Sequence, residues 1–139
     1  MKTSLSLLSL AVLISGCTQT PDAPAVASPQ VLAAGQQVYH TNCETCHQPD
    51  GYGVPDMQPA LVDDDIVAGD PTQIIRVVLQ GPANVLPAGR PTYSNVMPRF
   101  NQLTDEQVAD VLTYIRHEYG HDASPIGVDQ VKTVRSQFP

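Results

Sequence analysis

The sequence predicts an all-α domain with three main helices and a short C-terminal helix. Several segments repeat apolar residues at the helical period between capping residues, whereas no segment alternates apolar and polar residues convincingly as a strand does. Among the 139 residues 5% are aromatic and none is Trp, so side chains alone would build a thin core. The composition therefore leaves room for a large apolar cofactor.

The N-terminal residues are predicted to lie outside this domain. Lys2 precedes an apolar run over residues 5–14, which has the length of a signal-peptide core and is too short to span a bilayer. The run ends in Leu13-Ile14-Ser15-Gly16-Cys17. This resembles the bacterial lipobox, and the resemblance implies a signal peptide over residues 1–16 and a lipidated Cys17. One alternative is an ordinary signal peptide with an incidental Cys. The other is a buried core helix.

A tether rich in Pro, Ala, Ser and Thr is expected over residues 17–29, and a single folded domain over residues 30–139. Several acyl chains on Cys17 exceed what stable membrane anchoring needs. We therefore expect the protein to be lipid-anchored at the periplasmic side of a bacterial membrane. The choice between inner and outer membrane is left open.

The first two main helices have recognisable limits. The first is expected over about residues 31–45. One face of this helix carries Gly35, Tyr39 and Cys43, which are spaced four residues apart. The second is expected over residues 71–80, because Asp70 suits the N-cap and Gly81 suits the end. Gln73 is spaced to complete a pair resembling a capping box with Asp70.

The third main helix has the strongest boundary signals. Thr104 and Gln107 are spaced as a capping box, and Gly120 follows the last apolar position. The apolar stripe consists of Val108, Val111, Leu112, Ile115 and Tyr119. Arg116 and His117 fall near the C-terminal end, where cations favour the helix dipole. The short last helix is expected over residues 128–136. Its apolar and basic positions are Val128, Val131, Val134 and Arg135.

Residues 81–101 join the second and third helices and contain four prolines. A connection of this length without predicted secondary structure is usually functional. Proline restricts the backbone, so this loop is suited to hold a group in a fixed place.

Cys43-Glu44-Thr45-Cys46-His47 has the C-x-x-C-H spacing of c-type haem attachment. Two intervening residues let both thiols reach one haem, and the next residue can direct its imidazole at the iron. A zinc site would need about four ligands, and a thioredoxin-type motif would need a strand-helix-strand context. A structural disulfide would not need His47.

The domain resembles a class I cytochrome c over most of residues 30–135. The matching positions are Gly35, Tyr39, the C-x-x-C-H motif, Pro59-Ala60-Leu61, Met97-Pro98-Arg99-Phe100, Val111 and Tyr114. The resemblance implies the class I fold wrapped around one covalent haem c, with Cys43 and Cys46 as thioether attachments. It implies His47 and Met97 as axial ligands, and a hydrogen bond from His47 to the Pro59 carbonyl.

A narrower similarity covers residues 93–98, 103–107 and 110–116. These segments are similar to a bacterial subgroup that occurs as small cytochromes or fused domains serving periplasmic dehydrogenases or reductases. The subgroup's usual Trp-Gly-Asn after the last long helix is Tyr119-Gly120-His121 here. This departure makes the partner assignment less specific.

Other candidate side chains have ordinary interpretations. Met57 is expected in the core or at the haem edge, and residues 63–65, three Asp in a row, in a solvated turn. His40 is expected on the surface. His117 and His121 are expected near a helix end as dipole partners. For Arg90, Arg99 and Tyr93, contact with haem propionates and a plain surface role are both open.

The sequence thus predicts an electron carrier and not an enzyme. With 14 acidic and 7 basic residues, nucleic acid is not an expected partner. The expected partner is a periplasmic redox protein, namely a dehydrogenase, a reductase or a terminal oxidase. The alternatives are a haem-based sensor and a peroxidase-like enzyme with a displaceable distal ligand.

Overall fold

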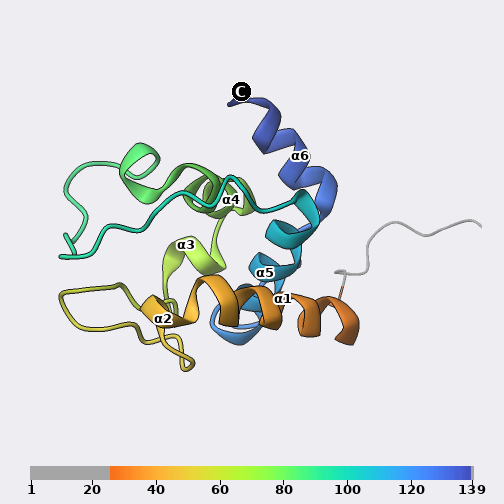
Figure 1. The fold of residues 1–139 in the computed structure, drawn as a ribbon, viewed down its shortest axis with the longest axis horizontal. Coiled ribbons are helices and arrows are strands. Elements are labelled where there is room, and N and C mark those ends of the chain that lie inside the picture. The colour runs from red at the N-terminus through yellow and green to blue at the C-terminus, as the bar shows by residue number, and fades with distance from the viewer. Residues whose placement is uncertain (1–25, 139) are drawn as a thin grey trace, which may run out of the picture.

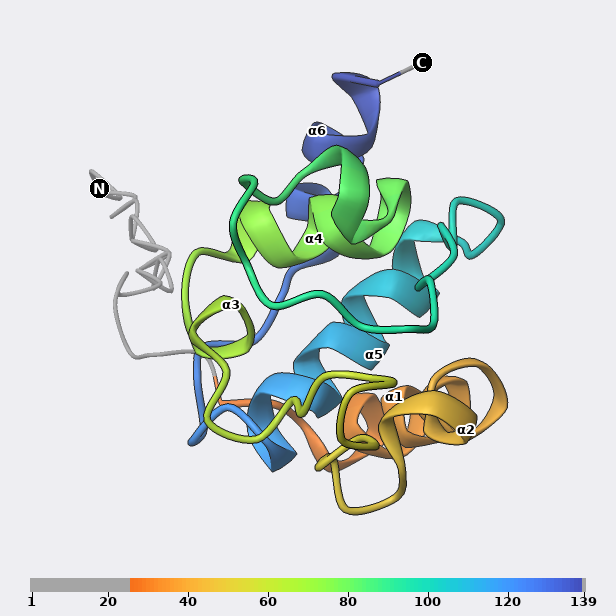
Figure 2. The same cartoon turned by 90° about the vertical axis from the view of Figure 1, so that its left-hand side faces the viewer.

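The structure is a computed structural model that describes residues 26–138 (Figures 1 and 2). Its helices, in chain order, are α1 (Pro29–Asn42), α2 (Glu44–His47), α3 (Asp65–Ala68), α4 (Pro71–Gln80), the 3₁₀ helix η1 (Pro82–Asn84), α5 (Asp105–Glu118) and α6 (Val128–Ser136). Within the described range the one strand-like pairing is an antiparallel bridge between Val54 and Gln58. The predicted all-α class is confirmed.

The predicted signal peptide, Cys17 and most of the tether lie outside the described residues. Within the described range, none of the helices has the length and apolarity that crossing a membrane would require.

The first predicted helix is divided into two. Ser28 caps α1 by accepting a hydrogen bond from the Val31 N–H at 3.3 Å, so the helix begins one residue before the expected domain start. It ends at Asn42 because Cys43 leaves the helical backbone region, with φ −120° and ψ −38°. The expectation of one continuous helix over residues 31–45 was therefore wrong. The break starts the short helix α2, in which the His47 N–H bonds the Cys43 carbonyl at 2.9 Å.

Helix α4 has the predicted bounds and α3 was not predicted. Asp70 caps α4 by accepting from the Thr72 N–H at 2.9 Å. The reciprocal bond expected from Gln73 is not formed in this helix. Asp64 accepts from two backbone N–H groups and starts α3, so the acidic run expected as a solvated turn is a helix N-terminus.

Helix α5 forms the centre of the molecule. Its capping box is present, with the Gln107 N–H donating to the Thr104 hydroxyl at 3.2 Å and the Thr104 N–H donating to the Gln107 side chain at 2.9 Å. The whole predicted stripe is buried. In Figure 2, α1 crosses the lower part of α5 while α4 and α6 lie above it.

The crossing of α1 over α5 depends on Gly35. A Cβ at this position would overlap the Asp110 carbonyl oxygen and would lie 2.7 Å from the Tyr114 Cβ. The absent side chain lets the two helices approach closely. As a result Tyr39 of α1 packs against Tyr114 and Tyr119, with ring centroids 5.5 and 5.6 Å away.

Arg116 has a different role from the one that its sequence position indicated. It is 2% exposed and crosses the core from α5. Its guanidinium donates to the carbonyls of Val67, Gly69 and Ser124 at 2.7, 2.9 and 2.7 Å. These bonds join α3 and the connection after α5 to the centre of the fold. The position of Arg116 near the end of the helix did not indicate them.

Candidate haem-binding site

Two chain segments extend from the same side of the helices (Figure 1), and a cavity lies between them. One segment follows α2 and the other precedes α5. The lining residues are Asn42, Cys43, Cys46, His47, Gln58, Pro59, Asn95, Val96, Met97, Pro98 and Phe100. The cavity therefore brings together every haem-site residue that the sequence indicated within the described chain.

The two thiols sit at the start of this cavity. Cys43 occupies the break between α1 and α2, and Cys46 lies on α2. In the structure neither forms a disulfide. Burial raises the pKa of the Cys43 thiol to about 11, so it is protonated at neutral pH and is a poor metal thiolate. Residues 26–138 contain no cluster of three or more His, Cys, Asp or Glu side chains suited to a metal, which disfavours the zinc alternative.

His47 is held in one orientation. Its side chain is largely buried, and Nδ1 lies 3.1 Å from the Pro59 carbonyl oxygen. A carbonyl can only accept, so Nδ1 carries the hydrogen and Nε2 keeps its lone pair. Burial lowers the pKa of His47, which keeps the imidazole in the neutral form that binds a metal. The contact implied for His47 and Pro59 is present.

Gly53 allows the loop to bring Pro59 to this place. It has φ +63°, and a Cβ on it would lie 2.5 Å from the Pro59 carbonyl oxygen. Its N–H also bonds the His47 carbonyl at 3.0 Å. The backbone around His47 is thus closed into a tight loop that a side chain at residue 53 would push open.

Two tyrosines brace the same loop. The Tyr39 hydroxyl donates to the Gln48 carbonyl at 2.6 Å, and the Tyr119 hydroxyl donates to the Pro49 carbonyl at 3.0 Å. Burial raises the pKa of Tyr39, so its hydroxyl remains a donor. Sequence reasoning placed both side chains on helix faces but missed that they hold the chain directly after His47. The signal is tertiary, since Tyr119 and Pro49 are seventy residues apart.

Met97 lines the cavity on the segment that precedes α5. The Ser94 and Asn95 N–H groups bond the carbonyls of Asp56 and Met57 at 2.9 and 3.2 Å, and the Phe100 N–H bonds the Val78 carbonyl at 2.8 Å. Met97 is therefore flanked by backbone anchors on both sides, in addition to the prolines that the sequence places in this loop.

The chemistry of the lining fits a covalently held haem. The cavity offers two thiols, one neutral imidazole and one thioether, and its exposed lining is mostly carbon. The Gln58 side-chain oxygen is also buried there without a hydrogen-bond partner among the described residues. Such an orphaned acceptor is costly unless a further group meets it.

The other candidate side chains do not line this cavity. His40 is exposed beside Glu44, as expected. His117 contacts Glu118 and Asp122, and His121 contacts Asp63. Met57 contributes its carbonyl to Asn95, and its side chain is exposed. Arg90 pairs with Asp64 at 3.6 Å, whereas Arg99 lies in a separate groove beside α4 and α6. Tyr93 is on the surface.

Comparison with known proteins identifies the family to which this chain belongs. The family model for cytochrome c matches residues 32–118, more than half of the chain. The chain is 41% identical over 93 residues to the cytochrome c subunit of a quinone alcohol dehydrogenase from Gluconobacter oxydans, covering 65% of this chain and 19% of that protein. It is 39% identical over 94 residues to the gluconate 2-dehydrogenase cytochrome c subunit of Pantoea cypripedii, covering 64% of this chain.

A third relative has a similar length. Cytochrome c-552 of Thermus thermophilus is 33% identical over 115 residues, which cover 76% of this chain and 86% of that protein. In contrast, the chain spans about a fifth of the length of the two dehydrogenase subunits.

Proposed function

This chain belongs to the cytochrome c family, is of class I and transfers electrons, and on that premise we propose that it is a monohaem carrier tethered at the periplasmic side of a bacterial membrane. The family holds haem c covalently. The single observation that supports the site assignment is the cavity in which Cys43, Cys46, His47 and Met97 meet.

Each of these residues has a separate task in the proposal. Cys43 and Cys46 would hold the haem through thioether bonds. His47 would bind the iron, oriented by Pro59, which would also increase the basicity of the imidazole. Met97 would supply a second ligand to the iron, and its anchored loop would keep the weak thioether in place. When bound, the haem supplies the iron that takes up and releases a single electron.

The proposed partner is a periplasmic dehydrogenase. The support is that relatives of this chain are cytochrome c subunits of alcohol and gluconate dehydrogenases. A reductase or terminal oxidase would accept the electron. The cavity rim offers an apolar docking surface, since Val96 lines the cavity and is 83% exposed.

The decisive experiment replaces Met97. Met97→Ala should retain covalent haem, because both thiols remain. It should remove the sulfur-to-iron charge-transfer band of the oxidised protein and admit carbon monoxide to the reduced protein. The potential should fall, on the order of 0.1 V within the roughly 0.8 V range that axial ligands set.

Met57→Ala is the matched control, since it removes an exposed methionine that does not line the cavity. It should change none of these properties. Loss of the band in the Met57 variant, with the Met97 variant unaffected, would contradict the ligand assignment. Carbon monoxide binding by the unaltered reduced protein at neutral pH would favour a sensor or a peroxidase-like enzyme over a carrier.

The proposed anchor is tested at Cys17. The unaltered protein should fractionate with membranes, whereas Cys17→Ser should not be processed as a lipoprotein. A chain starting at Val26 behind a cleavable signal, which keeps the Ser28 cap of α1, should be soluble and should keep the haem spectrum. Recovery of the unaltered protein in the soluble periplasmic fraction would refute the anchor and leave the haem assignment intact.

A further inference from the structure

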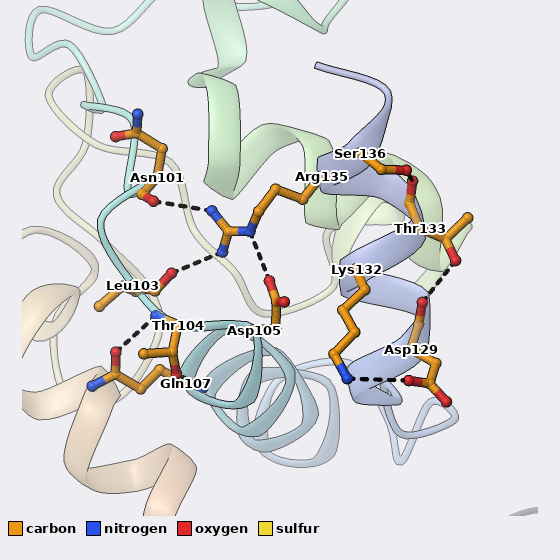
Figure 3. A network of polar contacts seen from close by, with 10 residues as sticks. All are labelled: Asn101, Leu103, Thr104, Asp105, Gln107, Asp129, Lys132, Thr133, Arg135 and Ser136. Carbon is orange, nitrogen blue, oxygen red and sulfur yellow. Dashed lines mark hydrogen bonds and ion pairs between the residues drawn. The ribbon is translucent and has the colours of Figure 1, made fainter. Parts of the chain in front are cut away.

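Arg135 lies on α6, beyond the residues 32–118 that match the cytochrome c family, yet its side chain reaches back to the chain around the start of α5 (Figure 3). Its Nε donates to the Asp105 carboxylate at 2.7 Å. Its Nη1 donates to the Asn101 carbonyl at 3.0 Å and its Nη2 to the Leu103 carbonyl at 2.8 Å. One guanidinium thus uses two nitrogens on the short stretch that joins Met97 to α5 and the third on the first residue of α5.

The acceptors on this stretch need such a donor. Asn101 and Leu103 precede Thr104, the N-cap of α5, so their carbonyls are outside the hydrogen-bond ladder of that helix. The Leu103 side chain is buried, and the bond to its carbonyl is partly buried. The rigid fork of an Arg suits acceptors spread over several residues, whereas the single nitrogen of a Lys does not.

Helix α6 gives Arg135 a firm base. Val131 and Val134, on the same helix, are buried against α4 and α5. The connection before α6 is tied to α5, because the Ile126 N–H donates to the Thr113 hydroxyl at 2.9 Å. The guanidinium is therefore held in place from the core side.

We propose that Arg135 is a positioning residue for the distal axial ligand. The inference rests on the proposed ligation by Met97. A thioether is a weak ligand and stays bound when its loop cannot move away. Pro98 stiffens the chain next to Met97, and Arg135 fixes the same chain from Asn101 to Asp105. Restraint at these points is transmitted to Met97 over a few residues.

The test follows the haem-loaded full-length protein through urea with two probes. The charge-transfer band reports Met97 on the iron, and far-ultraviolet circular dichroism reports the helices. In Arg135→Gln the band should disappear at a lower urea concentration than the helical signal. The gap between the two urea midpoints should be absent from the unaltered protein. Carbon monoxide should also bind the reduced variant roughly tenfold faster, about the factor expected from losing a charge-assisted hydrogen bond.

Three further variants separate positioning from simple stabilisation. Lys132→Gln removes the neighbouring cation of α6, whose partner Asp129 is on the same helix, and should behave as the unaltered protein. Val131→Ala weakens the buried face of α6 and should shift both probes together without a gap. Arg135→Lys should give a smaller gap than Arg135→Gln.

The outcomes distinguish this inference from the proposed function. If the unaltered protein lacks the band, ligation by Met97 fails and the role of Arg135 falls with it. If the unaltered protein has the band and Arg135→Gln shows no gap, or Val131→Ala shows the same gap, only the positioning role is overturned.

Discussion

At the scale of single residues, the site depends on positions where a side chain is absent as well as on its reactive groups. Gly53 lets the Pro59 carbonyl approach His47, and Gly35 lets α1 cross α5 at close range. Both glycines fall where another backbone occupies the space of a Cβ. The crossing matters for the site because α1 ends at Cys43, so its position sets where the haem-attachment motif begins.

Gly35→Ala should therefore destabilise the fold. Ala would gain about 1 kcal/mol of helix propensity, but its Cβ would overlap the Asp110 carbonyl, which is backbone and cannot rotate away. Separation of the helices should lower the free energy of unfolding by about 1–3 kcal/mol net. Chemical denaturation measures this.

The exposed neighbour Ala34 provides the control. Ala34→Ser should change stability by less than about 0.5 kcal/mol. Equal stability of Gly35→Ala and the unaltered protein would show that α1 can shift without cost. That result would contradict the claim that the fold depends on the close crossing of α1 and α5.

At the scale of elements, the helices have local signals at their ends but tertiary bonds hold them together. Thr104 and Gln107 start α5 by the capping box that their spacing predicted. In contrast, α3 and the connection after α5 are joined through Arg116, a buried cation whose bonds go to carbonyls. A buried cation of this kind stabilises the fold only if its N–H donors are paired with acceptors.

Arg116→Lys should test that requirement. A Lys keeps the positive charge but cannot reach the carbonyls of Val67, Gly69 and Ser124 together. Each buried acceptor left without a donor costs about 1–3 kcal/mol, so the free energy of unfolding should fall by roughly 2–4 kcal/mol. Thermal and urea unfolding provide the measurement.

Arg90→Lys is the matched control, because Arg90 is partly exposed and pairs with Asp64 at 3.6 Å. It should cost less than about 1 kcal/mol. Similar losses in the two variants would mean that the charge of Arg116, and not its fork of donors, is what the fold uses.

At the scale of the whole molecule, the net charge of −7 accompanies an apolar cavity rim. Lys132 is the one Lys after Lys2. The domain therefore lacks a ring of lysines that could attract an acidic partner. Val96 lines the cavity and is exposed; Tyr93 and Met57 do not line it but are exposed on the two segments that flank it. Docking should involve either a basic patch on the partner or apolar contact at this rim.

Electron-transfer rates with the physiological donor should consequently fall or remain nearly constant as ionic strength rises. Attraction between opposite charges is screened by salt, whereas apolar contact barely responds. Stopped-flow kinetics over a range of salt concentrations measures this. A steep increase of the rate with salt would indicate an acidic partner and would contradict the expectation.

Features that depend on residues close together in the chain could be predicted from the sequence. The C-x-x-C-H motif, the N-caps at Asp70 and Thr104 and the stripe of α5 depend on residues a few positions apart, so their spacing carries the information. The likeness to class I cytochromes c likewise rests on short motifs, and the family match confirms it. The short helix α6 was also predicted with its bounds.

Contacts between distant residues were decided by the tertiary structure. Three such contacts are the bond of Tyr119 to Pro49, the buried bonds of Arg116 and the bond of Arg135 to Asn101, and their partners have no fixed spacing in the chain. Burial and hydrogen-bond satisfaction are properties of the packed molecule, because a donor in the core takes whichever acceptor the fold brings near. The sequence therefore names the residues that we propose as haem ligands, while the packing determines which contacts hold those residues in position.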